Sequence, residues 1–191
     1  SGTACVECSS GYYAAHSGQS ACSKCYTGTT SEHASGSVRC VTGCVFNSTN
    51  NTQYNITALR GTVVGPVATT QPSGAFYFSV CDGVMPAGTC SSAATDDAHM
   101  HVCFAPTEGT AETGSQLNFG SLLEFVAAGA GTAEEDASFV LNFHGGETES
   151  ATGLPLTATV VFRCSTNAGV GVPQLLSYST ATATATFEWA S

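Results

Sequence analysis

The sequence predicts a mainly β protein in which a small, disulfide-stapled, cysteine-rich module is followed by a flattened β-barrel of two sheets. Five of the ten cysteines lie between residues 5 and 40, where aliphatic residues are few. From residue 44 onward, short alternating apolar and polar segments are separated by Gly, Pro, Asn and Asp clusters, which is typical of strands and turns. No segment combines helical periodicity with caps. We therefore expect two units, residues 1–43 and residues 44–191.

The first unit contains a short internal repeat. Cys5-x2-Cys8 and Cys22-x2-Cys25 open two similar segments of about 17 residues, and Cys40 closes the second; such repeats stack into rods. Two Cys-x2-Cys pairs also fit a zinc ribbon, but the odd cysteine count favours disulfides, so we expect no metal. Local pairing would join Cys8 to Cys22 and Cys25 to Cys40 and leave Cys5, whereas an alternating scheme would leave Cys40.

The second unit is predicted as a series of strands. Near the end of the sequence, in "TATATATFEW", Thr and Ala alternate before the only tryptophan; alternation of β-forming Thr indicates a strand. Five earlier segments alternate in the same way, and the first is followed by an Asp-Gly turn. The six expected strands are residues 74–81, 99–104, 121–126, 138–146, 157–164 and 180–189.

The charge balance excludes several classes of partner. The chain has 4 Lys+Arg against 14 Asp+Glu, for a net charge of −10. A groove for nucleic acid or an anionic membrane surface needs many cations, so we expect neither partner. No apolar run approaches the roughly 20 residues of a membrane-spanning helix, and no signal peptide opens the chain. We interpret the sequence as a processed or excised piece of a secreted or surface protein.

Three N-glycosylation sequons crowd one stretch, at Asn47, Asn50 and Asn55. Charged residues make up only 9% of the chain, against about 25% in ordinary soluble domains. Ten cysteines point to an oxidising compartment. We therefore expect an extracellular or cell-surface glycoprotein with N-linked and O-linked sugars.

Two family likenesses follow from these motifs. Residues 5–40 resemble the ephrin-receptor-like (GCC2/GCC3) repeats, through Cys-x2-Cys, "GTTS" and the closing "GSVRC". Residues 44–191 resemble the mannose-6-phosphate receptor homology (MRH) domain. Its landmarks occur in order: Cys44, "YNITALRG", "FYFSVCDGV", Cys90, "HVC", "LNFGSLLEF", "FVLNFHGGE", "ATVVFRC" and "TFEW". The resemblance implies a flattened barrel of two sheets, disulfides joining Cys44 to Cys81 and Cys90 to Cys103, and a secretory-pathway lectin or its descendant.

The sugar-binding residues of that family are missing. Lectin members hold mannose with a glutamine, an arginine, a glutamate and a tyrosine, whose amide, guanidinium and carboxylate groups pair with sugar hydroxyls. The corresponding positions are Phe104, Thr157, the loop before the last strand around residues 174–179, which has no acid, and Ala185. A mannose-type lectin acting by the family mechanism is therefore not expected.

One cysteine is left over in each unit. The family's partner for Cys164 is missing, because Ala183 stands near its position, and the first unit leaves Cys5 under local pairing. An odd cysteine in a secreted domain points to intermolecular pairing, and heterologous contacts that do not close form filaments. We therefore predict an intersubunit Cys5–Cys164 disulfide. The alternatives are the same bond within one chain, a free thiol at Cys164, or a Cys5 that once paired upstream of a cut end.

Other groups of reactive residues favour structural roles. His99 and His101 would share a strand face, but we interpret them as a polar face beside Cys103 rather than a metal pair. The acidic residues 134–136 are interpreted as a solvated loop, as are Glu147 and Glu149, and nothing brings two carboxylates together for hydrolysis. With no catalytic motif in the sequence, we expect no enzyme and no cofactor.

These observations favour a non-catalytic extracellular structural or adhesive glycoprotein that acts through protein–protein contacts. One form of this function is head-to-tail self-assembly into a surface or extracellular fibre, with copies of the chain or other extracellular proteins as partners. The alternative is a lectin or cargo-receptor-like module that binds a glycan through residues other than the usual mannose-binding quartet. Periodic fibres would favour the first function, and glycan binding the second.

Overall fold

The computed structural model describes residues 7–14, 19–25, 29–31, 35–37, 40–48, 51–70, 73–81, 100–106, 116–127, 138–163 and 171–190. These residues are mainly β, as the sequence predicts, and their helix content is one 3-10 turn, η1 (Thr57–Leu59). No helix within these ranges is long and apolar enough to cross a membrane. The strands are β1 (Tyr12–Tyr13), β2 (Ser23–Lys24), β3 (Thr29–Ser31), β4 (Cys40–Thr42), β5 (Val45–Asn47), β6 (Gln53–Asn55), β7 (Val64–Thr70), β8 (Ser73–Phe78), β9 (Val102–Pro106), β10 (Leu117–Gly120), β11 (Leu122–Ala127), β12 (Ser138–His144), β13 (Thr157–Arg163), β14 (Gln174–Ser179) and β15 (Thr184–Ala190).

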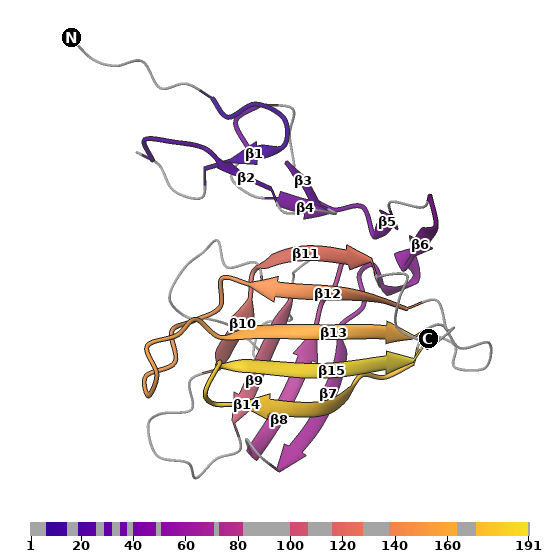
Figure 1. Cartoon of the computed structure of the whole chain (residues 1–191), viewed down its shortest axis with the longest axis vertical. Helices are drawn as coiled ribbons and strands as arrows, with labels where there is room; N and C mark the ends of the chain where they lie inside the picture. The colour runs from indigo at the N-terminus through magenta and orange to yellow at the C-terminus, as the bar shows by residue number, and fades with distance from the viewer. Residues whose placement is uncertain are drawn as a thin grey trace.

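Two sheets form the body of the protein (Figure 1). One is antiparallel, with strand order β10-β9-β8-β7. The other has the order β11-β12-β13-β15-β14, in which β13 and β15 run parallel and the other neighbours antiparallel. The two sheets cover each other across one core, so the flattened two-sheet architecture predicted from the sequence is confirmed.

Side-chain alternation sets which face of each strand enters this core. In β13 and β15 every second residue is buried, starting from Ala158 and Ala185, and the residues between are half-buried on the outer face. This period of two is what the Thr/Ala alternation predicts. The final Trp189 is completely buried.

Aromatic rings fill most of the core. The ring of Trp189 stacks on Phe162 at 5.1 Å, and Phe162 stacks on Phe139 at 4.7 Å. From the other sheet, Phe78 meets Trp189 edge-to-face at 6.0 Å, and Phe76 meets Phe119 at 5.1 Å. Buried rings contribute large apolar area and directional contacts. The Phe78–Trp189 contact joins the two sheets, and the other three pairs pack within one sheet.

The N-terminal segment is held by disulfides between short strand pairs. β1 pairs with β2, and β3 with β4. Cys8 is bonded to Cys22 and Cys25 to Cys40, with Cα atoms 5.7 Å apart in each pair. Among its described residues only Cys8, Ser31 and Ser37 are buried, so cross-links replace a hydrophobic core. β3 lies against β11 of the barrel (Figure 1).

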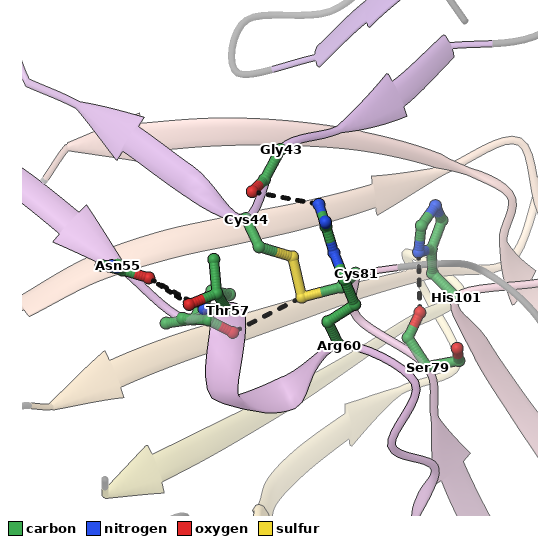
Figure 2. The surroundings of a disulfide bond; sticks show 9 residues. Gly43, Cys44, Asn55, Thr57, Arg60, Ser79, Cys81 and His101 are labelled. Atoms are coloured by element: carbon green, nitrogen blue, oxygen red, sulfur yellow. Dashed lines mark hydrogen bonds between the residues drawn. A yellow bond between two sulfur atoms is a disulfide. The ribbon is translucent and has the colours of Figure 1, made fainter.

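A third disulfide, Cys44–Cys81, fastens the start of the barrel to the end of β8 (Figure 2). Both cysteines are buried, and Cys81 Sγ lies 3.5 Å from the carbonyl oxygen of Ile56. Arg60 Nη2 donates to the carbonyl oxygen of Gly43 at 3.4 Å. The Cys44–Cys81 disulfide therefore ties the segment around residue 44 to the four-stranded sheet.

Two strand predictions are corrected. Residues 174–179, expected as a loop, form β14, whose bulge between Leu175 and Ser177 breaks the alternation. Residues 180–183, expected in the last strand, form a turn in which Ala183 has φ 51°. β7 is not among the six expected strands; it contains Pro66, which lacks a backbone N–H and is tolerated on an edge strand.

Candidate ligand-binding end of the barrel

The loop between β12 and β13, residues 145–156, folds into a compact structure that we call the clasp loop. Leu156 N donates to the Glu147 carbonyl at 2.7 Å, and Glu149 N to the Leu154 carbonyl at 2.8 Å. Gly153, with φ 69°, makes the tight turn between them and donates back to the Glu149 carbonyl at 2.9 Å. These backbone bonds give the loop a defined shape.

The clasp loop bonds to both sheets. On the four-stranded sheet, Glu147 N donates to the Asn118 carbonyl of β10 at 2.9 Å. Gly146 is needed for this approach, since a Cβ there would overlap the backbone oxygens of Leu156 and Asn118. On the five-stranded sheet, the Tyr178 hydroxyl of β14 donates to Glu149 Oε1 at 2.9 Å. The loop therefore bridges the two sheets at this end of the barrel.

Glu149 is the centre of a polar cluster. Its second oxygen, Oε2, accepts a hydrogen bond from Thr152 Oγ1 at 2.7 Å. The Tyr178 ring lies 6.1 Å from that of buried Phe119. Before β10, the buried Oε1 atom of Gln116 has no hydrogen-bond partner among the described residues. Each carboxylate oxygen keeps a lone pair after one bond, so Glu149 can still accept hydroxyl donors.

Two groups at this end have shifted pKa values. Partial burial, the hydrogen bond to Glu149 and the negative charge of that carboxylate raise the pKa of Tyr178 to about 12. Partial burial also raises the pKa of Glu147 above its ordinary value, and a hydrogen bond from the backbone of Asn118 opposes that rise. The phenol of Tyr178 therefore stays a neutral donor through the physiological range.

This shift predicts a pH dependence of stability. The folded state raises the pKa of Tyr178 from 10.0 to about 12, so its contribution is complete below pH 10 and is lost as the pH rises toward 12. We expect the wild-type protein to lose stability across that window more steeply than Tyr178→Phe. Denaturant titrations at a series of alkaline pH values measure this difference. Tyrosinate absorbance should lose its most alkaline step in Tyr178→Phe; an unchanged titration curve would contradict the assignment.

The positions of the family's sugar-binding quartet lack the family's glutamine and arginine, and two of these positions lie in the core. Phe104, 3% exposed, packs 4.8 Å from Phe76 in the core, and Ala185 is completely buried. Thr157 lies on the outer face, where its hydroxyl is 2.8 Å from that of Thr184. Residues 174–179 form β14 and contribute Tyr178, which pairs across the strands with Ala185.

The Tyr178–Glu149 contact was not predicted from the sequence, which placed Glu149 in a solvated loop. The two residues are 29 positions apart, and neither lies in a motif that points to the other. A local signal exists only in the Gly145-Gly146 pair, which marks a place where backbone segments approach closely.

The predicted glycosylation sites lie at the other end of the barrel. Asn47 and Asn55 are exposed on the β5–β6 hairpin, which lies opposite the clasp loop in Figure 1. The backbone N–H and the hydroxyl of Thr57 donate to Asn55 Oδ1 at 3.0 and 2.8 Å (Figure 2). Asn50 lies outside the described residues. Glycan attachment at all three sites stays a prediction.

The remaining predicted cysteine and histidine sites are partly described. Cys103 is disulfide-bonded. Its expected partner Cys90, the expected Cys5–Cys164 bond, His99 and the acidic residues 134–136 lie outside the described ranges. His101 is buried, with Nδ1 2.9 Å from the Ser79 carbonyl oxygen (Figure 2). The described part of the chain contains no group of three or more His, Cys, Asp or Glu arranged to hold a metal ion.

Two carboxylates on the five-stranded sheet, Glu124 and Glu188, have separate partners. Glu124 Oε2 lies 3.2 Å from His144 Nε2, and Glu188 Oε2 accepts a 2.9 Å bond from Arg163 Nε. Both pairs are half-exposed on the outer face of the five-stranded sheet. They are interpreted as surface ion pairs, which contribute little to stability.

Two solved structures share this fold. Domain 11 of the echidna mannose-6-phosphate/IGF2R receptor, solved in solution by NMR, aligns with a TM-score of 0.52 and 18% sequence identity over 77% of this chain and 90% of that chain. Chicken IGF2R domain 11 aligns with a TM-score of 0.50 and 22% identity over 78% of this chain and 88% of that chain. No family model matches the sequence, and no curated protein matches it.

At these identities the likeness shows the fold, which is MRH-like, and the MRH resemblance seen in the sequence is confirmed at that level. Both neighbours are receptor domains. Nothing in the comparisons bears on the ephrin-receptor-like repeat, which stays a prediction for residues 5–40.

Proposed function

We propose that this chain is a non-catalytic recognition module of the secretory pathway or cell surface, which binds a neutral glycan at the clasp-loop end of the barrel. The chain would bind this glycan through residues at positions other than those of the four mannose-binding residues of MRH lectins. The observation that carries this proposal is the hydrogen-bonded pair of Tyr178 and Glu149, held between the two sheets at one end of an MRH-like fold.

The chemistry of the cluster suits sugar hydroxyls. A carboxylate accepts two neighbouring hydroxyl donors, and its preorganisation by Thr152 and Tyr178 reduces the entropy lost on binding. The exposed part of the clasp loop adds the hydroxyl of Ser150 and the apolar surface of Leu154, which is 40% exposed. Polar groups beside a small apolar surface are typical of ligand sites.

The charge at this end indicates a neutral rather than an anionic ligand. Glu147 and Glu149 are both in the clasp loop, and within the described ranges no Lys or Arg lies in that loop or in the strand ends beside it. Arg163 pairs with Glu188 at the far end of β13, and Arg60 bonds to Gly43. A phosphorylated sugar would therefore meet repulsion without a compensating cation.

Disulfide bonds support the location in the proposal, because they form and persist in oxidising compartments. The fibre built through Cys5–Cys164 stays a prediction, since both cysteines lie outside the described residues. Non-reducing peptide mass spectrometry tests it: an intrachain Cys5–Cys164 peptide in monomers would contradict it.

A glycan array probed with the full glycosylated chain tests the proposed site. We expect binding to neutral glycans, weakened about tenfold or more in Glu149→Gln, because a hydrogen bond to a charged group is worth about 1.5–3 kcal/mol. Glu188→Gln is the matched control: it removes a partly exposed, hydrogen-bonded carboxylate on β15, outside the clasp loop, and should bind as wild type. Absence of binding by the wild type, or equal binding by Glu149→Gln, would overturn the proposal.

A further inference from the structure

The side chain of Asn55 is held in one orientation by the threonine of its own sequon. The backbone N–H and the hydroxyl of Thr57 both donate to Asn55 Oδ1, at 3.0 and 2.8 Å (Figure 2). An Asn side chain that accepts from the backbone two residues ahead forms an Asx turn. Both bonds use the carboxamide oxygen, so they leave Nδ2, the atom to which an N-linked glycan is attached, out of the turn.

The backbone on both sides of Asn55 is also fixed. Asn55 lies opposite Val45 in the β5–β6 hairpin. The next residue, Ile56, is buried; its N–H donates to the Cys44 carbonyl at 2.9 Å, and its carbonyl oxygen lies 3.5 Å from Cys81 Sγ. A sugar on Asn55 would therefore extend from a fixed point beside the Cys44–Cys81 disulfide.

The sequon at Asn47 is held less firmly. Asn47 Oδ1 accepts from Gln53 Nε2 at 3.4 Å, a long bond between two exposed side chains. Asn50 lies outside the described residues. Of the two described sequon asparagines, Asn55 is thus the one whose side chain is bonded twice within 3.0 Å.

The two faces of the β5–β6 hairpin meet different surroundings. Phe46 and Tyr54 face the barrel, where the Phe46 ring stacks on Phe125 at 4.9 Å and the Tyr54 ring lies 4.9 Å from that of Phe139. Since side chains alternate along a strand, residues 45, 47, 53 and 55 lie on the outward face, where they are partly or fully exposed.

The outward face is where a sugar on Asn55 would lie. Asn55 Oδ1 is turned toward Thr57, so Nδ2, on the other side of the carboxamide carbon, is directed away from Thr57 and back over the hairpin. Directly opposite residues of an antiparallel pair have Cβ atoms about 4.5–5.5 Å apart. The first sugar would therefore reach the half-buried side chain of Val45.

We propose that an N-linked glycan on Asn55 is a structural part of this hairpin, in which the first sugar covers Val45 and stabilises the strand pair. This role goes beyond the proposed glycan-binding function and does not depend on it. In the transfer, Nδ2 loses one proton and bonds to the anomeric carbon of an oligosaccharide. The bond from that carbon to a lipid pyrophosphate donor breaks, and the pyrophosphate oxygen leaves with the electron pair. Oδ1 keeps both hydrogen bonds from Thr57.

The hairpin is a structure that one added contact can stabilise. Each strand has only three residues, and two-stranded hairpins of this size are marginal by themselves. The apolar face of a sugar ring would remove part of Val45 from water. Because Thr57 already fixes the Asn55 side chain, ordering the first sugar costs less conformational entropy than it would at Asn47.

Glycopeptide mass spectrometry of the full chain, secreted from a eukaryotic host, measures the occupancy of each sequon. We expect Asn55 to carry a glycan. An unmodified Asn55 in the secreted protein would overturn the proposal.

Denaturant unfolding of the wild type and of Asn55→Gln measures what the glycan contributes, with each protein made both with glycans and under inhibition of N-glycosylation. The pair without glycans isolates the loss of the Thr57 bonds, which the substitution also removes. We expect Asn55→Gln to lower the folding equilibrium constant about fivefold more in the glycosylated pair, the effect of one good cross-strand contact. Asn47→Gln is the matched control on the same face, and it should lower the constant by the same factor with and without glycans.

Nuclear Overhauser contacts in the wild-type glycoprotein supply a measurement that needs no variant. Protons of the first N-acetylglucosamine on Asn55 should show contacts to the Val45 methyl groups, and these should persist after an endoglycosidase trims the glycan to that one sugar. Absence of these contacts would overturn the proposal. So would equal factors for Asn55→Gln with and without glycans, or a glycan-dependent loss in Asn47→Gln as large as that in Asn55→Gln.

Discussion

Replacing Trp189 with alanine is expected to lower the free energy of unfolding by about 3–5 kcal/mol, the range for removing a large buried ring. Trp189 is completely buried, stacks on Phe162 at 5.1 Å with an interplanar angle of 20°, and meets Phe78 edge-to-face. Its loss leaves a cavity between the two sheets. Denaturant titration followed by circular dichroism measures the change without relying on tryptophan fluorescence.

Two further variants make this prediction specific. Trp189→Phe keeps an aromatic ring against Phe162 and should retain more than half of the lost stability. Val172→Ala truncates an apolar side chain that is 62% exposed and should change stability by no more than about 0.5 kcal/mol. A loss below about 1 kcal/mol for Trp189→Ala would show that the core does not depend on the aromatic stack.

Removing the Cys44–Cys81 disulfide as the double alanine variant is expected to destabilise the barrel by about 4 kcal/mol. The bond closes a loop with a sequence separation of 37, and the chain-entropy model gives about this value for a loop of that length. Both positions are buried, and the alanine side chain is apolar, so the substitution introduces no unsatisfied polar group. Thermal and denaturant unfolding of the oxidised proteins measure the difference.

The matched control is the Cys25→Ala, Cys40→Ala variant, which removes a disulfide of the N-terminal segment. If residues 1–43 and 44–191 are separate units, the barrel transition should stay where it is in the wild type. A barrel transition lowered equally by both double variants would contradict the predicted boundary. A Cys44→Ala, Cys81→Ala variant as stable as wild type would show that packing alone fixes the start of the barrel.

The strands that alternate strictly could be predicted from the sequence because their two faces meet different environments. One face of β12 and β13 packs into the core against the other sheet, so on that face every second residue is apolar. β14 could not be predicted, since its bulge at Leu176 shifts the alternation in mid-strand. In residues 180–183 the alternation continues through a turn, because Ala183 reaches a positive φ without a change in residue pattern.

The candidate site could not be predicted from the sequence. The absence of the family's sugar-binding residues stays a prediction, and Phe104 and Ala185, two of the positions compared, are buried. The Tyr178–Glu149 pair depends on how the clasp loop folds back between β10 and β14. Loop conformation depends on tertiary contacts that residue patterns do not encode locally.

The order of strands in the five-stranded sheet has a consequence for biosynthesis. β15 is made after β13 and β14, yet it lies between them and pairs with both. Until residues 184–190 leave the ribosome, β13 and β14 each expose a strand edge, and Phe162 lacks one of its two stacking partners, Trp189. Sheets of such long-range contacts form slowly and are prone to aggregation while incomplete. The nascent chain should therefore depend on chaperones until its last strand inserts.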